Sequence, residues 1–238
     1  MKIVTWNWHM DLRSNKNSAT KVAYLLKQKP DVAVIPEASE ADMNLFDTTS
    51  YSHQWIGIGE EKRYGLGMLV KRPFKLSERK HHGNLIASAN VMLDGKRAFT
   101  LIAVWPVAKG YSGYTKEIMN AFKSDGMLWP ADNKVIVAGD FNSHVQWNDK
   151  CPKTCNHTSI VNFLRDKGLV SGYHKHHNLE QGSEEHKTHF HNNGETYHLD
   201  YIFIPEKWSK GIVASVSSRE ELNKLSDHAP LSVTIKDF

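Results

Sequence analysis

A nine-residue stretch decides the fold: KVIVAGDFN, residues 134–142. It opens with a short run rich in β-branched residues, which is the composition of a strand buried on both faces. Gly139 ends the apolar run, and Asp140 and Asn142 then place a carboxylate and an amide at its end. A carboxylate at the end of a buried strand is costly unless it is paired, hydrogen-bonded or bound to a cation. The stretch therefore indicates a buried strand that carries a polar site.

Toward the N-terminus, the pattern of a buried strand followed by a polar residue occurs twice more. Residues 3–6 (IVTW) precede Asn7, and residues 32–35 (VAVI) are followed, after a proline, by Glu37. Between the two runs, apolar residues recur at helical spacing after Ser18, which is a plausible helix N-cap. The N-terminal part is therefore predicted to be a strand–helix–strand unit.

The rest of the chain predicts more strands than helices. Expected strands cover residues 54–58, 66–70, 85–93, 98–104, 197–204, 212–216 and 229–235, and expected helices cover 114–122 and a segment from Thr158 or Ser159 to Gly168. Asp94-Gly95 is a hairpin-turn signal. Because helices lie between the strands, we expect an α/β fold of two sheets packed face to face with helices outside. No stretch reads as a linker, so we expect a single domain over residues 1–238.

The composition excludes several classes of protein. Of 238 residues, 40% are hydrophobic, which is enough for a core and excludes intrinsic disorder. No apolar run approaches the ~18 residues of a membrane span, and two cysteines, Cys151 and Cys155, exclude a disulfide framework. The first residues, MKIVTW, do not begin a secretory signal, so we expect a cytoplasmic monomer without a membrane partner. The net charge of +4 permits a polyanionic partner without demanding one.

Polar side chains end or interrupt apolar strands at five places along the chain. They are Asn7, Glu37, Asp140 with Asn142, Asp200, and Asp227 with His228. Hard oxygen ligands with one imidazole are what a Mg²⁺ or Mn²⁺ phosphoesterase needs. A hard cation neutralises phosphate charge, a carboxylate orients or deprotonates water, and an imidazole donates a hydrogen bond to phosphoryl oxygens.

The segments around these residues resemble the endonuclease/exonuclease/phosphatase superfamily, which includes DNase I, exonuclease III, inositol polyphosphate 5-phosphatases and neutral sphingomyelinases. The matching segments are TWN (5–7), Pro36-Glu37, GDFN (139–142), HLDYIF (198–203) and SDHAPL (226–231). They follow the order of the family and cover nearly the whole chain. The resemblance, to a compact bacterial-type member, implies a four-layer α/β sandwich of two packed mixed sheets flanked by helices. The active site would lie at one end of the two sheets.

The resemblance also implies a metal site that holds Mg²⁺ or Mn²⁺. Glu37 is the expected principal metal ligand, and Asn7 is expected to support it through the metal or the phosphate. Asp227 is expected to bind metal or to polarise the site.

The remaining motif residues carry implied catalytic roles. Asp140 is expected to position and activate the attacking water, and Asn142 to hold the phosphate or the nucleophile. His228 is expected to contact the scissile phosphate and stabilise its charge. Asp200 is expected to orient His228, as a carboxylate behind a histidine fixes its tautomer.

Two positions depart from the family pattern. Many members place a His or Tyr after the strand that here ends in Val104, and this chain has Trp105, whose indole donates one hydrogen bond but is no acid or base. Many DNA-repair members carry an acidic residue where this chain has His9. Trp105 and His198 are the candidate substrate-binding residues. For His198, structural hydrogen bonding is an equally good interpretation.

These observations leave three functions open. The first is a metal-dependent phosphodiesterase that hydrolyses nucleic acid, DNA rather than RNA, by in-line attack of water on phosphorus. The second is the same chemistry on a small-molecule or lipid phosphate, since the motifs bind only phosphate and metal. The third is an inactive binding module that kept the fold, which the presence of every catalytic residue type disfavours.

Overall fold

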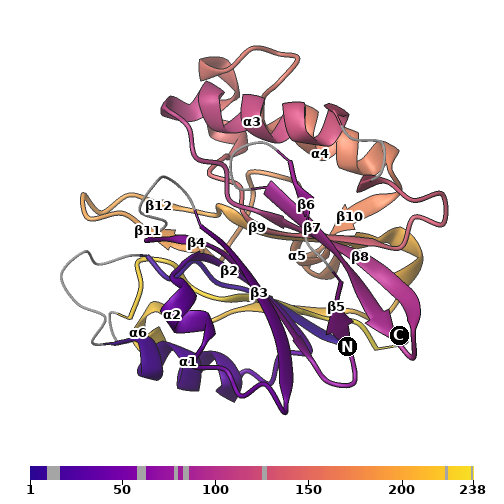
Figure 1. Cartoon of the computed structure of the whole chain (residues 1–238). Helices are drawn as coiled ribbons and strands as arrows, with labels where there is room; N and C mark the ends of the chain where they lie inside the picture. Colours follow the sequence, from indigo (N-terminus) through magenta and orange to yellow (C-terminus); the bar gives the residue numbers. More distant parts are fainter. Residues whose placement is uncertain are drawn as a thin grey trace.

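Two β-sheets lie face to face with helices on both outer sides in the computed structural model (Figure 1), as the sequence predicts. The structure describes residues 1–9, 17–57, 63–77, 80–82, 86–124, 128–222, 225–236 and 238. Expected strand residues Ile58 and Leu85 lie outside these ranges. Over the described residues the helices and strands follow the order expected from the sequence, with differences at element ends.

The first sheet contains both N-terminal strands. Its order is β14 (Val213–Val216), β15 (Leu231–Thr234), β1 (Lys2–Thr5), β2 (Val32–Ala38), β4 (Gly65–Lys71) and β3 (Tyr51–Gly57). Only the β1–β2 pair is parallel among these strands. Its outer face is covered by α1 (Ser18–Lys27), α2 (Glu40–Met43) and α6 (Arg219–Leu222).

The second sheet is built around β9, the strand predicted from KVIVAGDFN. Its order is β10 (Leu169–Ser171), β13 (Asp200–Pro205), β9 (Val135–Asp140), β8 (Lys96–Val104), β7 (Ile86–Leu93) and β5 (Lys75–Leu76), and β6 (Lys80–His81) also pairs with β7. Its outer face is covered by α3 (Gly110–Ser124) and α4 (His157–Asp166) (Figure 1). The remaining elements are η3 (Val145–Lys150), α5 (Gly172–His177), η4 (Glu206–Trp208) and a hairpin of β11 (His189–Phe190) and β12 (Thr196–Tyr197).

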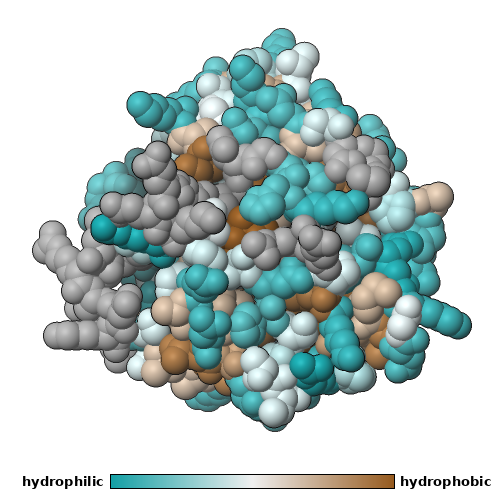
Figure 2. Space-filling view, viewed as in Figure 1, coloured by the Kyte–Doolittle hydropathy of each residue, from teal (hydrophilic) through white to brown (hydrophobic). Residues whose placement is uncertain are grey.

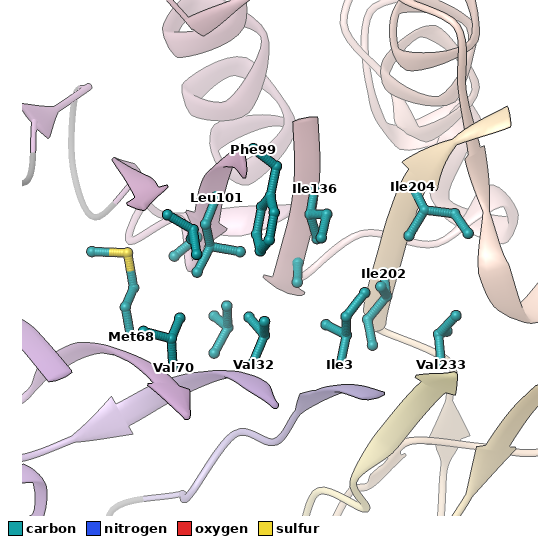
Figure 3. Close-up of a cluster of buried hydrophobic side chains, with 14 of the residues drawn as sticks. Ile3, Val32, Met68, Val70, Phe99, Leu101, Ile136, Ile202, Ile204 and Val233 are labelled. Atoms are coloured by element: carbon teal, nitrogen blue, oxygen red, sulfur yellow. The ribbon is translucent and has the colours of Figure 1, made fainter. Parts of the chain in front are cut away.

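Three apolar layers hold the four layers of secondary structure together. The middle layer joins the two sheets, and Figure 3 shows Ile3, Val32 and Val233 of the first sheet opposite Ile136 and Ile202 of the second. The two outer layers pack helices against the outer sheet faces. The face seen in Figure 2 is mainly hydrophilic, with hydrophobic residues in small patches. No helix among the described residues is long and apolar enough to cross a membrane.

Local signals placed the β7–β8 turn correctly, but the expected helix starts were wrong. Asn17 rather than Ser18 caps α1, and α3 begins at Gly110 rather than at Tyr114. The β7–β8 hairpin turns at Asp94 and Gly95, with φ of 50° and 75°, as the sequence predicts. Helix α4 is capped by Asn156 rather than by Thr158 or Ser159. The Asn156 side chain accepts from the amide of Ser159, whose hydroxyl accepts from the amide of Asn156 in return. Ser159 completes the reciprocal cap three residues into the helix.

Strand directions gather the polar strand ends at one edge. Strands β1 and β2 are parallel and end on the same side of the sheet. Asn7 follows β1 and Glu37 lies near the end of β2, so both residues lie on that side. In the second sheet Asp140, at the end of β9, pairs with Asp200, at the start of the antiparallel β13. The expected strand 197–204 is therefore two strands, with His198 and Leu199 between them.

Candidate active site

Asn7 links the two sheets at this edge. Its Nδ2 donates to Oε1 of Glu37 at 2.9 Å and to Oδ2 of Asp140 at 3.0 Å. Its Oδ1 accepts from the amide of His9 at 2.8 Å. Asn7 is completely buried. Its amide nitrogen holds two carboxylates of different sheets in register, and its oxygen is satisfied by the His9 amide.

A β-bulge in β2 directs Glu37 toward Asn7. Pro36 pairs with Leu66 and Ala38 pairs with Gly65, so the strand register shifts at Glu37, whose φ is 60°. A Cβ on Gly65 would lie 1.7 Å from the carbonyl oxygen of Ile56 on β3. Gly65 therefore permits close backbone approach beside the bulge, a common role of glycine inside a strand.

Asp140 is the buried carboxylate of the site. Asn142, at a φ of 47°, donates its amide to Oδ1 of Asp140 at 2.9 Å and its Nδ2 to Oδ2 at 3.1 Å. Burial raises the pKa of Asp140, and the neighbouring His228 opposes that rise. A carboxyl group with a raised pKa is a stronger base than an exposed aspartate.

His228 lies between two carboxylates. Its Nδ1 donates to Oδ2 of Asp200 at 2.8 Å, and its Nε2 lies 4.0 Å from Oδ2 of Asp140. Burial lowers the pKa of His228, but the charges of Asp200 and Asp140 outweigh burial and raise it. The imidazolium form is therefore favoured, with Nε2–H directed toward the site.

Backbone contacts fix the loop that carries His228. The hydroxyl of Ser226 accepts from the amide of His228 at 3.0 Å and donates to the carbonyl of Asn7 at 2.7 Å. The indole of Trp6 donates to the carbonyl of His228 at 2.8 Å. The closing SDH segment is thereby tied to the opening strand, 222 residues apart in sequence.

Asp227 contacts two imidazoles. Its Oδ2 lies 3.1 Å from Nδ1 of His9 and 3.8 Å from Nε2 of His189, while its Oδ1 is buried without a hydrogen-bond partner among the described residues. The His-rich segment that contains His189 indicates exposed loop positions first and ligands second, so the sequence did not place His189 at the site. The β11–β12 hairpin brings it to the site.

The two candidate substrate-binding residues differ in position. Trp105 follows β8, keeps 8% of its surface exposed and packs in the layer between the sheets. His198 is completely buried, and its Nδ1 donates to the carbonyl of His186 at 2.9 Å. This placement fits the structural interpretation of His198 and gives it no exposed surface for a substrate.

Tyr114 is a site residue that the sequence did not reveal. It lies half-buried on α3, and its hydroxyl has no hydrogen-bond partner among the described residues. Burial and then the charges of Asp140 and Glu37 raise its pKa, so the hydroxyl keeps its proton. The sequence predicted a helix here, but a polar residue inside a helix lacks the strand-end signal that marked the other site residues.

The residues at this edge fit a hard divalent cation with few protein ligands. Among the described ranges, no three His, Cys, Asp or Glu side chains form a metal cage. Mg²⁺ is usually held by one or two carboxylates, with water and substrate phosphate completing its coordination. Glu37 with Asn7 supplies that kind of donor set, and Oδ1 of Asp227 is a further buried oxygen without a partner among the described residues.

Two packed mixed sheets with a polar site at their common edge define the DNase I-like class of α/β proteins. The chain belongs to the Endonuclease/Exonuclease/phosphatase family, which it matches over residues 4–228. Membership makes it one of a family of enzymes that hydrolyse phosphate esters.

Solved structures share this fold at low sequence identity. A 3′ phosphatase, NExo, from Neisseria bound to a product DNA hairpin is 18% identical over 99% of each chain, with a TM-score of 0.67. TDP2 from D. rerio, complexed with a single-strand DNA product, is 16% identical over 98% of this chain and 97% of that one, with a TM-score of 0.66. An AP endonuclease from Archaeoglobus fulgidus is 16% identical over 99% of each chain, with a TM-score of 0.65. No curated protein matches the chain.

Proposed function

We propose that the protein is a divalent-metal-dependent phosphodiesterase that hydrolyses nucleic acid, DNA in preference to RNA. One observation carries the proposal. Asn7, Glu37, Asp140 and His228 come from four separate segments, and each lies within hydrogen-bonding or ion-pairing distance of another at one edge of the two sheets. Family membership and the DNA products bound to two of the similar structures support it.

In this proposal Glu37, supported by Asn7, would hold Mg²⁺ or Mn²⁺. When bound, such a cation neutralises the charge of the phosphate and of the leaving oxygen. Asp227, directly before His228 in the sequence, would contribute to the same charge balance. Glu37 is held in a bulge and by the Asn7 amide, so it meets the cation with little loss of side-chain freedom.

The side chains of the chain itself carry the remaining steps. Asp140 orients the attacking water and accepts its proton, while the Asn142 amide holds the phosphate or the nucleophile. His228 donates from Nε2 to a phosphoryl oxygen and stabilises the charge that develops during in-line attack. Asp200 keeps Nδ1 of His228 occupied, so that Nε2 faces the substrate.

Tyr114 is proposed to supply a hydroxyl donor that Trp105 cannot supply. A neutral phenol near Asp140 and Glu37 is placed to donate to a phosphoryl oxygen rather than to act as a base. Its free hydroxyl, among the described residues, has no protein partner to give up when substrate binds.

The test is a substrate panel with purified protein. Labelled single-stranded DNA, duplex DNA, RNA, a phosphomonoester and a phospholipid are each incubated with Mg²⁺, Mn²⁺ or chelator. We expect metal-dependent cleavage of DNA, and a loss of about 10³-fold or more in Asp140→Asn and His228→Asn. Asp149→Asn, at an exposed carboxylate of η3, is the control. Full activity in Asp140→Asn would contradict the roles, and cleavage confined to the phosphomonoester or lipid would favour the alternative substrate class.

A further inference from the structure

A row of aromatic rings leads away from His228 across the surface. The ring of His189 lies 4.6 Å from that of His228, and Tyr197 lies 6.2 Å further along at an interplanar angle of 15°. Trp147 follows at 4.8 Å from Tyr197, and Tyr111 stacks on Trp147 at 4.4 Å and 28°. We call His189, Tyr197, Trp147 and Tyr111 the aromatic strip.

Three different elements build the aromatic strip. His189 and Tyr197 are a cross-strand pair of the β11–β12 hairpin, Trp147 lies in η3, and Tyr111 lies in the first turn of α3. The hairpin is tied to the catalytic loop, because the amide of Phe190 donates to the carbonyl of Asp227 at 2.8 Å. The strip is therefore continuous with the active site and held at a fixed position relative to it.

The far end of the strip is exposed and carries a cation. Tyr111 exposes 36% of its surface, one of the larger exposures of an apolar side chain among the described residues. Nζ of Lys150 lies 4.7 Å from the centre of the Tyr111 ring. Core packing explains Trp147, which is 8% exposed, but it does not explain an exposed tyrosine that carries a lysine on its ring.

We propose that the aromatic strip binds unpaired nucleobases of a single-stranded segment next to the scissile phosphate. The inference rests on the proposed function and specifies its substrate. Exposed aromatic rings bind bases by stacking, and a nearby lysine binds the backbone that connects them. A regular duplex keeps its bases stacked inside, so a row of rings favours a strand whose bases are free.

A base that stacks on Tyr111 would displace the side chain of Lys150 from the Tyr111 ring. In the free protein Lys150 lies over the ring, in a contact that is weak at exposed sites. Stacking of a base on an aromatic ring is the stronger interaction, and the displaced ammonium group gains a phosphate partner. The long side chain of Lys150 can make this move without a change in the backbone of η3.

The experiment measures binding without hydrolysis. Fluorescence anisotropy in chelator compares a labelled single strand, the matching duplex and a strand with abasic sites. We expect the single strand to bind best, and Tyr111→Ala to weaken it by about 5- to 100-fold. Tyr111→Phe, which keeps the ring, should bind like the wild type. Phe238→Ala is the control, since this side chain is 47% exposed and packs against Phe74, Phe99 and Trp208 instead.

Two further measurements identify the chemistry. Tyr111→Ala should not weaken binding of the abasic strand further, because the lost contact is with a base. Lys150→Gln should reduce the slope of log affinity against log salt by about 1. Equal binding of the single strand by wild type and Tyr111→Ala would overturn the inference while leaving DNA hydrolysis intact. Absence of any nucleic-acid cleavage in the substrate panel would instead overturn the proposed function.

Discussion

Tyr114 shows how much of the site depends on a single atom. Its ring is fixed on α3, and its hydroxyl is a neutral donor near two carboxylates. The side chain differs from phenylalanine by that oxygen alone, so a substitution can remove the donor and keep the packing.

We expect Tyr114→Phe to lower kcat by about 10²-fold, the loss typical of one donor to a developing oxyanion. The melting temperature should stay close to that of the wild type, because the hydroxyl has no partner within the described part of the protein. Steady-state kinetics on DNA and a thermal melt check both expectations. Tyr51→Phe on β3 is the matched control, and an unchanged kcat in Tyr114→Phe would remove Tyr114 from the site.

Asp200 is proposed to be a positioning residue whose effect passes through its hydrogen bond with His228. We expect Asp200→Asn to lower kcat by about 10- to 100-fold, because the amide no longer fixes which imidazole nitrogen carries the proton. NMR of the imidazole nitrogens should report a changed tautomer of His228. A loss of activity with an unchanged His228 signal would mean that Asp200 supports the fold rather than the histidine.

The residue scale is also where the sequence was most informative. The positions of Asp140 and Glu37 at the ends of strands could be predicted, because a polar side chain after an apolar run is visible in the local sequence. The His-rich run 174–177 indicates an exposed loop, yet His174 is buried and donates to Glu184 at 2.9 Å. His144 donates to the other oxygen of Glu184 at 3.1 Å. Burial of these polar groups depends on a partner distant in sequence, which no local pattern reveals.

At the scale of elements, the bulge of β2 illustrates the same limit. Strands β2 and β4 were both predicted from composition, but the extra residue at Glu37 depends on the register between these two strands. Register is a property of two paired strands, and the sequence of one strand does not contain it. A glycine inside a strand, such as Gly65, is a local sign of a bulge or of close backbone approach, but it does not say which residue of the neighbouring strand bulges.

We expect Gly65→Ala to lower the free energy of unfolding by at least about 3 kcal/mol, because its Cβ would overlap the Ile56 carbonyl at 1.7 Å. Gly95→Ala is the comparison: its Cβ meets nothing within 4 Å, and its φ of 75° costs about 1 kcal/mol. Urea unfolding of the two variants measures both. A loss in Gly65→Ala no larger than that in Gly95→Ala would show that the chain relaxes the close contact at little cost.

At the scale of the whole molecule, buried histidines couple the fold to pH. Burial lowers the pKa of His157 to about 4 and that of His198 to about 3. Burial raises the pKa of Glu184, but hydrogen bonds from His144 and His174 outweigh burial and hold this pKa well below its usual range. On unfolding each histidine regains an ordinary pKa near 6.5, so below that pH the unfolded chain binds more protons.

We therefore expect the stability contributed by these groups to be full above about pH 7 and to fall as the pH drops from about 6.5 toward 4, with Glu184 adding to the loss below about pH 4.5. The raised pKa of His228 acts in the opposite direction, because its contribution is lost as the pH rises above about 6.5. Each of His157 and His198 should contribute about 2 kcal/mol of that loss by pH 5. Urea unfolding at pH 7.5 and 5.0 measures the slope. His157→Gln should flatten it, whereas His191→Gln, at an exposed site, should not. An identical slope in His157→Gln would assign the acid sensitivity elsewhere.

The hydrogen bond from Asn7 to Asp140 joins side chains that belong to different sheets. Its length is set far from the chemistry, by the methyl groups interleaved between the sheets (Figure 3). Any slippage of one sheet over the other would separate the two halves of the catalytic centre while every strand kept its own partners. Enzymatic activity is therefore expected to be sensitive to the relative position of the two sheets. On warming, activity should be lost at a lower temperature than the circular dichroism signal of the strands.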